Sequence, residues 1–355
     1  MNNRILYLHG RPSSHFLHNS LATSLGVDHK PIDEKYRWQD QEFGPLRNLY
    51  AWFRNAFAYK GYQHYDYILV DGLHFSPIIA KKLGILPKRI TIIAHMGNQL
   101  PYFFLAKKIP FYSRLMHKWL INNYDHIFCE GEFMRGMIRR MRPDIKPSLH
   151  VTFLGPLENR LKVLHTIQPQ FATNTMISIA TGPGEARIYY KGLDIMCEAF
   201  LMARKDMPEL KYYIVGNWSE ADISRLTKGY SVEDRKNIFF VGHSDNIEDY
   251  MKNADLSIHT ARGDAFPTST VEAMHAGVPI IVSDQTGTKQ IIEEAHLDLI
   301  VEPSAEQLAA KIRWYFNLPL EEKKELSEKL RVSASNYTEA KAIKHYQNTF
   351  KQIKS

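Results

Sequence analysis

Short apolar segments that end in tight turns recur along the chain, separated by stretches long enough for a helix. Each is rich in β-branched or aromatic residues, which predicts a buried strand of a parallel sheet. The first series is Arg4–Gly10, Tyr65–Gly72, Arg89–Gly97 and Tyr124–Gly131. The second series is Met176–Gly182, Leu210–Gly216, Lys236–Gly242, Ala254–Thr260 and Val278–Asp284. This alternation predicts an α/β protein of two Rossmann-like domains, with ligands in the cleft between them, outside the carboxyl ends of the strands.

The boundary between the domains is predicted in Leu157–Thr175, where the periodicity lapses and the charge balance changes sign. We therefore expect a first domain over residues 1–165 and a second over residues 166–335. In the second domain, a helix beginning near Lys191 is expected to bury one apolar stripe. That stripe consists of Leu193, Met196, Cys197, Phe200 and Leu201.

Composition and charge narrow the class of protein. The chain has 355 residues, of which 44% are hydrophobic and 23% charged, as in a soluble globular enzyme of two domains. The opening residues lack a signal-peptide layout, so a cytoplasmic location is expected. Residues 1–170 hold 23 Lys and Arg against 12 Asp and Glu, whereas residues 171–355 hold 22 against 26. The basic half suits nucleic acid, an anionic membrane or a phosphorylated acceptor, or is simply a solvated surface.

Two acids stand eight positions apart in the segment RGDAFPTSTVEAMHAGVP. Asp264 lies in a tight loop, and Glu272 lies in the first turns of a short predicted helix. A helix N-terminus attracts anions, and carboxylates beside it can accept hydrogen bonds from sugar hydroxyls. The alternative is that Glu272 only complements the helix dipole while Asp264 closes a turn.

Two cations stand four positions apart in TGPGEARIYYKG, after a predicted strand. A glycine turn opening onto a helix with Arg187 and Lys191 beside it offers a diphosphate both backbone donors and fixed positive charge. A dinucleotide fingerprint is disfavoured, because Arg187 occupies the position of its third glycine. The remaining alternative is a pair of surface cations near a turn.

The acid pair resembles the signature of retaining nucleotide-sugar glycosyltransferases of family 4, in which Glu, seven residues and Glu precede a small-residue turn and a proline. Asp264 replaces the first Glu here. The resemblance implies a GT-B fold, with a C-terminal helix at about 336–355 packing back on the first domain. It also implies that Arg187 and Lys191 hold the donor diphosphate, that Glu272 grips the ribose, and that Asp264 orients the donor sugar. Backbone atoms of Phe266, Pro267 and Thr268 are expected to assist Asp264.

Weaker features keep the order of that family. The turns at Gly216 and Asn217, and at Gly242 and His243, are expected near the donor, and Thr288 beside the diphosphate. In the first half, Gly10 matches a glycine loop that approaches the donor phosphate. His95 matches a histidine that points at the donor sugar, although a histidine at a strand end is commonly structural.

The resemblance implies a metal-independent retaining transferase that moves a sugar from a nucleoside diphosphate sugar to a hydroxyl acceptor, with no other cofactor. The acceptor is expected to be a glycan or lipid-linked glycan of a cell-surface polysaccharide pathway. Two alternatives stay open: a nucleotide-sugar epimerase on the same scaffold, and a non-catalytic sugar-nucleotide-binding subunit, suggested by Asp264 in place of Glu.

A basic and aromatic stretch spans residues 100–143. This composition suits docking on the inner face of an anionic membrane, at about 1 kcal/mol per basic residue, or an ordinary helix pair with basic outer faces. No motif for binding nucleic acid accompanies the charge, so nucleic acid is not expected as a partner. Its cations are Lys107, Lys108, Arg114, Lys118, Arg135, Arg139, Arg140 and Arg142.

Overall fold

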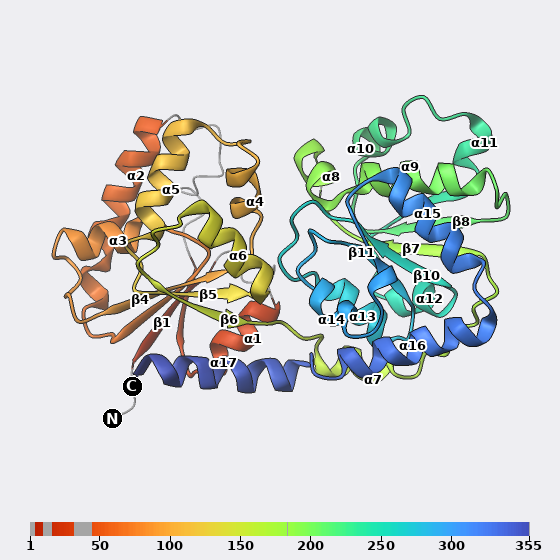
Figure 1. The fold of residues 1–355 in the computed structure, drawn as a ribbon. Coiled ribbons are helices and arrows are strands. Elements are labelled where there is room, and N and C mark those ends of the chain that lie inside the picture. Colours follow the sequence, from red (N-terminus) through yellow and green to blue (C-terminus); the bar gives the residue numbers. More distant parts are fainter. Residues whose placement is uncertain (1–3, 10–15, 32–44, 183, 355) are drawn as a thin grey trace. The chain divides into compact units, whose positions relative to one another are not determined.

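The computed structural model describes residues 4–9, 16–31, 45–182 and 184–354 (Figure 1). The chain forms two compact units, one of residues 1–154 with 342–355 and the other of residues 155–341. Each unit has a parallel sheet of six strands, with helices on both faces. This architecture confirms the predicted α/β class with two Rossmann-like halves. Among the described helices, none combines the length and the apolar character needed to span a bilayer.

The first unit has a sheet of order β2-β1-β3-β4-β5-β6. Its central strands are almost fully buried, as continuous apolar runs predict. The strands are β1 Ile5–His9, β2 Asp28–Pro31, β3 Tyr67–Asp71, β4 Thr91–Met96, β5 His126–Glu130 and β6 Ser148–Thr152. The helices are α1 Phe16–Thr23, α2 Pro45–Phe57, the 3-10 helix η2 Ala58–Tyr62, α3 Phe75–Lys82, α4 Leu100–Leu105, α5 Phe111–Ile121 and α6 Gly131–Met141.

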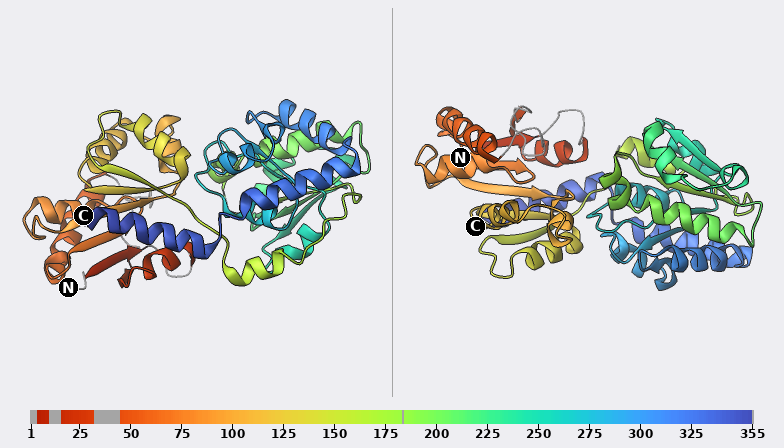
Figure 2. Two further views of the ribbon diagram at one scale, coloured as in Figure 1. Left: turned by 60° about the horizontal axis from the view of Figure 1, so that its bottom comes forward. Right: turned by 90° about the horizontal axis from the view of Figure 1, so that it is seen from above.

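The last helix, α17 (Glu339–Lys354), packs on the first unit (Figure 2). Its Phe350 meets Tyr67 of β3 edge to face at 5.0 Å, and its Tyr346 meets Phe128 of β5 at 5.1 Å. The Gln347 amide donates to the carbonyl of Ser24 at 2.8 Å. Aromatic residues spaced along one face of α17 thus cover the sheet of the first unit.

The second unit has a sheet of order β12-β11-β10-β7-β8-β9. Its strands are β7 Thr175–Ile179, β8 Lys211–Val215, β9 Ile238–Gly242, β10 Leu256–His259, β11 Ile280–Ser283 and β12 Ile300–Val301. Its helices are α7 Glu158–Leu164, α8 Glu185–Lys191, α9 Leu193–Arg204, α10 Glu220–Leu226, α11 Val232–Arg235, α12 Ile247–Lys252, α13 Thr268–His275, α14 Lys289–Glu293, the 3-10 helix η3 Leu297–Leu299, α15 Ala305–Phe316 and α16 Leu320–Ala334.

All nine strands predicted from apolar runs are present, and three further strands were missed. These three, β2, β6 and β12, lie at sheet edges. An edge strand pairs on one side only and is partly solvated, so its sequence needs no continuous apolar run. β2 reads DHKP, and β12 has two residues.

The helix predicted to begin near Lys191 is α9, and a separate short helix, α8, precedes it. Lys191 ends the short helix α8, and α9 begins at Leu193 after a glycine in the left-handed region (Gly192, φ +69°). A Cβ at position 192 would lie 2.0 Å from the carbonyl oxygen of Thr260, so only glycine fits. The predicted apolar stripe on α9 is buried from Leu193 to Phe200, while Leu201 is partly exposed.

Candidate functional site

The residues predicted to bind a donor in the second unit follow the carboxyl ends of neighbouring strands. Because β7 to β11 are parallel, the turns after them lie at one edge of the sheet, the usual ligand edge of such folds. Arg187 and Lys191 follow β7, and Asp264 follows β10. The other predicted residues at or after the ends of these strands are Gly216, Asn217, Gly242, His243, Phe266, Pro267, Thr268 and Thr288.

Lys191 and Asp264, 73 positions apart in sequence, are in direct contact. The Lys191 Nζ lies 2.5 Å from Asp264 Oδ2, and both side chains are largely buried. The end of α8 is tied to the loop after β10, because the Arg262 amide donates to the Tyr190 carbonyl at 2.9 Å. The predicted cation and the predicted acid therefore belong to one site.

Asp264 has two further hydrogen-bond partners that the sequence did not reveal. His259 Nε2 donates to Asp264 Oδ2 at 3.0 Å, and the Tyr190 hydroxyl donates to Oδ1 at 3.4 Å. Burial alone would raise the pKa of Asp264, but Lys191 and His259 hold it far below its usual value. Asp264 is thus an ionised, oriented acceptor, and its Oδ1 retains capacity for a ligand hydroxyl.

Arg187 adds a second positive charge to the same place. Its guanidinium lies 5.4 Å from the centre of the Tyr190 ring, and the Lys191 ammonium lies 5.8 Å from that ring. Burial, with Arg187 as a smaller contribution, lowers the pKa of Lys191, although Asp264 opposes this. Two cations beside one aromatic ring, one of them buried, are stabilised by an anion between them, which suits a diphosphate.

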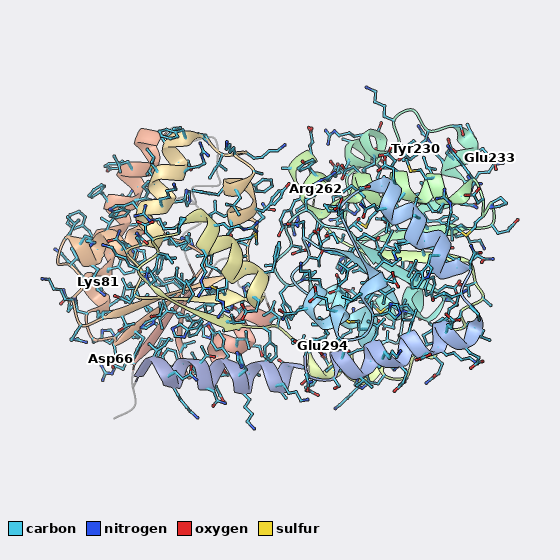
Figure 3. The ribbon with its side chains drawn as sticks, in the orientation of Figure 1. Asp66, Lys81, Tyr230, Glu233, Arg262 and Glu294 are labelled. Atoms are coloured by element: carbon cyan, nitrogen blue, oxygen red, sulfur yellow. The ribbon has the colours of Figure 1, made fainter. Side chains whose placement is uncertain are left out.

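A neighbouring arginine has a structural role. Arg262 is labelled on the second unit in Figure 3. Its guanidinium stacks over Tyr189 at 4.0 Å and pairs with Asp194 of α9 at 2.7 Å. It also donates to the Tyr189 carbonyl at 2.7 Å. These contacts fix α8 against α9 and so support the position of Lys191.

The loop from Asp264 to α13 is fixed by contacts with the turn after β11. The Gly287 amide donates to the carbonyl of Asp264 at 2.8 Å. The hydroxyls of Thr270 and Thr288 lie 2.7 Å apart, and Thr270 Oγ1 also donates to the Pro267 carbonyl at 2.7 Å. The structure therefore joins Thr288 to the segment at Pro267, and α13 begins at Thr268.

The turns after β8 and β9 approach each other at the same edge. The Gly216 backbone N–H donates to the Gly242 carbonyl at 2.8 Å, and the Asn217 backbone N–H donates to Thr181 Oγ1 at 3.0 Å. A Cβ at position 216 would lie 1.8 Å from the Ala180 carbonyl oxygen, which explains the glycine. His243 is exposed, and its Nε2 lies 3.2 Å from Asp245 Oδ1.

Glu272 lies on α13 and pairs with an arginine from another element. Its Oε1 is 3.7 Å from Arg160 Nε of α7, and Arg160 also contacts Glu248 at 2.8 Å. Burial raises the pKa of Glu272 to about 7, even though Arg160 acts to lower it. Arg160 therefore links Glu272 to Glu248, and this contact is separate from the Lys191–Asp264 pair.

The pKa of Glu272 predicts how donor binding depends on pH. If its carboxylate accepts hydrogen bonds from the ribose, the affinity for UDP-glucose as a probe should rise about tenfold from pH 6 to pH 8, as the carboxyl loses its proton. Titration calorimetry at several pH values measures this. The Glu272→Gln variant should bind more weakly and lose that rise. An equal rise in both proteins would contradict the assignment.

His95 belongs to a buried charged cluster in the first unit, at the carboxyl ends of three strands. Glu130 Oε1, at the end of β5, lies 3.2 Å from His95 Nε2 and 2.6 Å from His18 Nε2. His18 Nδ1 lies 3.1 Å from Asp71 Oδ1, at the end of β3. Burial alone would lower the pKa of His18, but Glu130 and Asp71 raise it well above its usual value. Burial alone would raise the pKa of Glu130, but His18 and His95 hold it below its usual value.

The same cluster offers ligand atoms for a cation. Atoms of His18, His95 and Glu130 lie within 4.8 Å of one another, a spacing that a divalent metal could bridge. Their short mutual distances also fit a hydrogen-bonded ion cluster with no metal. The expectation of a metal-independent enzyme stays a prediction. Gly10, the other residue predicted for the site in this unit, lies outside the described residues.

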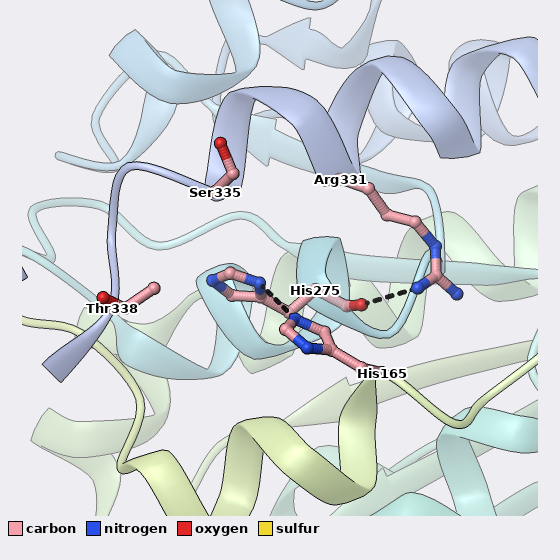
Figure 4. Close-up of a pocket in the computed structure, with 5 residues that line it drawn as sticks. All are labelled: His165, His275, Arg331, Ser335 and Thr338. Atoms are coloured by element: carbon pink, nitrogen blue, oxygen red, sulfur yellow. Dashed lines mark hydrogen bonds between the residues drawn. The ribbon is translucent and has the colours of Figure 1, made fainter. Parts of the chain in front are cut away.

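A cavity in the second unit is lined by residues that were not predicted for the site (Figure 4). His165 Nε2 and His275 Nδ1 lie 3.1 Å apart within it. Arg331 donates to the carbonyls of His275 and Ala276 at the end of α13. These contacts cap α13 and stabilise the helix that carries Glu272.

Some of these functional candidates had a signal in the sequence, and others had none. His259 and Glu130 each lie near the end of a predicted strand, where parallel α/β folds place ligand-binding residues, so their positions gave a signal. Arg160 lies in the segment interpreted as a domain boundary, and nothing in its surroundings marks it as a partner of Glu272.

Comparison with known proteins is consistent with this geometry. Residues 185–334 match the family model described as glycosyl transferases group 1, so the second unit carries a domain of this kind. The chain is 22% identical over 297 residues to the phosphatidylinositol N-acetylglucosaminyltransferase gpi3 subunit of Schizosaccharomyces pombe, covering 81% of this chain and 60% of that protein. It is 29% identical over 116 residues to the poly(glycerol-phosphate) alpha-glucosyltransferase of Bacillus subtilis, covering 32% of this chain and 17% of that protein. The chain thus spans about three fifths of the first relative and under a fifth of the second.

The fold has solved counterparts over almost the whole chain. The Anabaena protein HepE in complex with UDP and glucose aligns with a TM-score of 0.69 and 15% identity, covering 99% of this chain and 100% of that one. The two six-stranded parallel sheets therefore have the arrangement of strands and helices found in GT-B proteins.

Proposed function

We propose that the protein is a retaining, metal-independent glycosyltransferase of family 4 that moves a sugar from a nucleoside diphosphate sugar to a hydroxyl acceptor. The contact of Lys191 with Asp264, with Arg187 beside it, carries this proposal. As the bond from the anomeric carbon to the diphosphate breaks, the leaving group gains negative charge, which Lys191 and Arg187 stabilise. The Lys191 ammonium has three donors, so it can hold Asp264 and a phosphate oxygen together.

The other side chains take roles in holding the donor. Asp264 and the backbone at Phe266 and Thr268 orient the donor sugar, and Glu272 accepts hydrogen bonds from the ribose. The strand-end turn at Gly216 is assigned near the donor, the turn at Gly242 towards the base, and Thr288 towards the diphosphate. A leaving-group oxygen takes the acceptor proton, so no general base is assigned to the chain.

The proposed acceptor is a glycan or lipid-linked glycan of a cell-surface polysaccharide pathway, reached from the inner face of the membrane. Two relatives are named for sugar transfer to acceptors that contain phosphate, phosphatidylinositol and poly(glycerol phosphate). The excess of Lys and Arg in residues 1–170 is complementary to such an acceptor and to an anionic membrane surface.

The experiment is a screen of nucleotide sugars, UDP-sugars first, by thermal shift and then by turnover. We expect a bound donor to raise the melting temperature, and we expect nucleoside diphosphate release that an added acceptor accelerates. NMR of the anomeric proton should show retention. Conversion of the sugar with no release of diphosphate would indicate an epimerase, and binding with no conversion would indicate a non-catalytic subunit.

A further inference from the structure

Two helices of the first unit expose apolar side chains that a helix of a soluble domain normally turns inward. Fifteen large apolar side chains are exposed in the described part of the chain, and eight of them lie on α2 and α5, which together span 24 residues. The eight are Leu49, Tyr50, Phe53 and Phe57 on α2, and Phe111, Tyr112, Leu115 and Trp119 on α5. This concentration marks an interaction surface, because single exposed apolar residues are ordinary but a cluster of eight is not.

The exposed residues form one stripe on each helix. Both sets have the spacing i, i+1, i+4 and i+8, which covers an arc of about 100° on an α-helix. The inner faces are filled separately, with Trp52 and Ala56 buried on α2 and His117 and Leu120 buried on α5. The exposed stripes are therefore additional to the core of the unit.

The two stripes belong to adjacent helices. Phe75 of α3 stacks on Trp52 of α2 at 4.0 Å and on Trp119 of α5 at 6.4 Å, so one ring holds both helices. Figure 1 shows α2 and α5 beside each other in the first unit. We call the eight exposed residues together the α2/α5 surface.

The two segments that carry this surface have only basic charged residues, and acidic residues flank them in sequence at Asp40, Glu42, Asp66 and Asp125. Residues 45–65 and 97–124 contain seven Lys and Arg and no Asp or Glu. Aromatic and aliphatic side chains flanked by basic residues are the composition of helices that lie in a membrane interface. An anionic partner is therefore complementary in charge, and a fluid lipid surface can accommodate two neighbouring stripes with no matching groove.

We propose that the α2/α5 surface docks on an anionic lipid bilayer. This surface specifies which residues of the chain contact the membrane, and its biological purpose rests on the proposed function. The α2/α5 surface is separate from the basic residues of α6. Arg139 and Arg140 are exposed, but α6 exposes none of the fifteen large apolar side chains, and its Arg135 pairs with Glu132 at 2.5 Å.

The test is sedimentation of the full chain with vesicles of phosphatidylcholine and phosphatidylglycerol in about a two-to-one ratio. The wild type should sediment with these vesicles, and binding should fall in high salt or with phosphatidylcholine alone. The variants Phe53→Ser/Phe57→Ser and Phe111→Ser/Leu115→Ser should each weaken binding about tenfold or more. The matched control, Val232→Ser/Leu297→Ser, removes two exposed apolar residues of the second unit and should bind as the wild type does.

Thermal unfolding of each variant shows whether it is folded. Unchanged vesicle binding in both α2 and α5 variants, or no binding of the wild type, overturns the proposal. If the α2 and α5 variants lose binding to a single-stranded oligonucleotide to the same extent as binding to vesicles, the surface binds nucleic acid instead. If the variants lose self-association and the wild type does not bind vesicles, the surface is an interface between copies. A failure of sugar transfer alone would refute the proposed function and leave the vesicle result standing.

Discussion

Replacing Lys191 by alanine should lower sugar transfer about a hundredfold, which corresponds to about 3 kcal/mol of lost transition-state stabilisation. Lys191 is largely buried and held 2.5 Å from Asp264, so its charge is oriented before the reaction begins. The loss should appear mainly in kcat, because the leaving diphosphate gains charge as the bond breaks. Arg187→Ala should have a similar effect, since both cations face the Tyr190 ring. Steady-state kinetics with the donor found in the screen measure both changes.

The matched control is Lys236→Ala, which removes another lysine paired with a carboxylate. Lys236 lies 2.6 Å from Glu233, but both side chains are exposed. This variant should keep the activity of the wild type. Thermal unfolding of each variant shows whether a loss of activity comes from a loss of folding. We expect the Lys191→Ala protein to fold, because His259 still contacts Asp264. If folded Lys191→Ala and Arg187→Ala proteins transfer sugar at the parent rate, the assignment of the site is wrong.

Replacing Glu130 by glutamine should destabilise the protein by about 3 kcal/mol, or roughly 6–12 °C in Tm. Glu130 is buried between His18 and His95, so the neutral amide leaves a buried imidazolium with Asp71 as its remaining carboxylate. The pKa of His18 is raised and that of Glu130 is lowered, so both groups are charged at neutral pH. The stabilisation from Glu130 is therefore present at neutral pH and lost as the pH falls through its lowered pKa.

Urea unfolding at neutral and acid pH measures this difference. Glu132→Gln is the matched control, since Glu132 lies two residues away, is exposed, and pairs with Arg135 on the surface of the same helix. Its effect should stay within about 0.5 kcal/mol. Equal stability of the Glu130→Gln protein and the wild type at neutral pH would show that the cluster contributes nothing to the fold.

The strands of the fold could be predicted where both faces are buried, because such strands are continuous apolar runs. A strand such as β4 is apolar at nearly every position because helices cover both sides of the sheet, and this pattern is visible in sequence. The edge strands β2 and β12 have no such continuous apolar run. Nor could composition show that Gly192 lies between two helices, because this depends on the close approach of Thr260, which follows β10.

The candidate site was predictable to the extent that its chemistry is local. Asp264 and Lys191 were selected from short motifs, and the structure places them in contact. His259 was marked only by its place at a strand end, and Arg160 by nothing, because their importance comes from partners that only the folded chain brings close. The elevated pKa of Glu272 likewise follows from burial, which no spacing of residues encodes.

The glycine between α8 and α9 has a consequence for how inherited variation in this protein would be interpreted. Residue 192 has no functional group, yet its left-handed backbone ends α8 at the proposed diphosphate-binding lysine. A change there to any larger residue would displace that lysine, so a null allele could arise at a position that touches no substrate and carries no reactive atom.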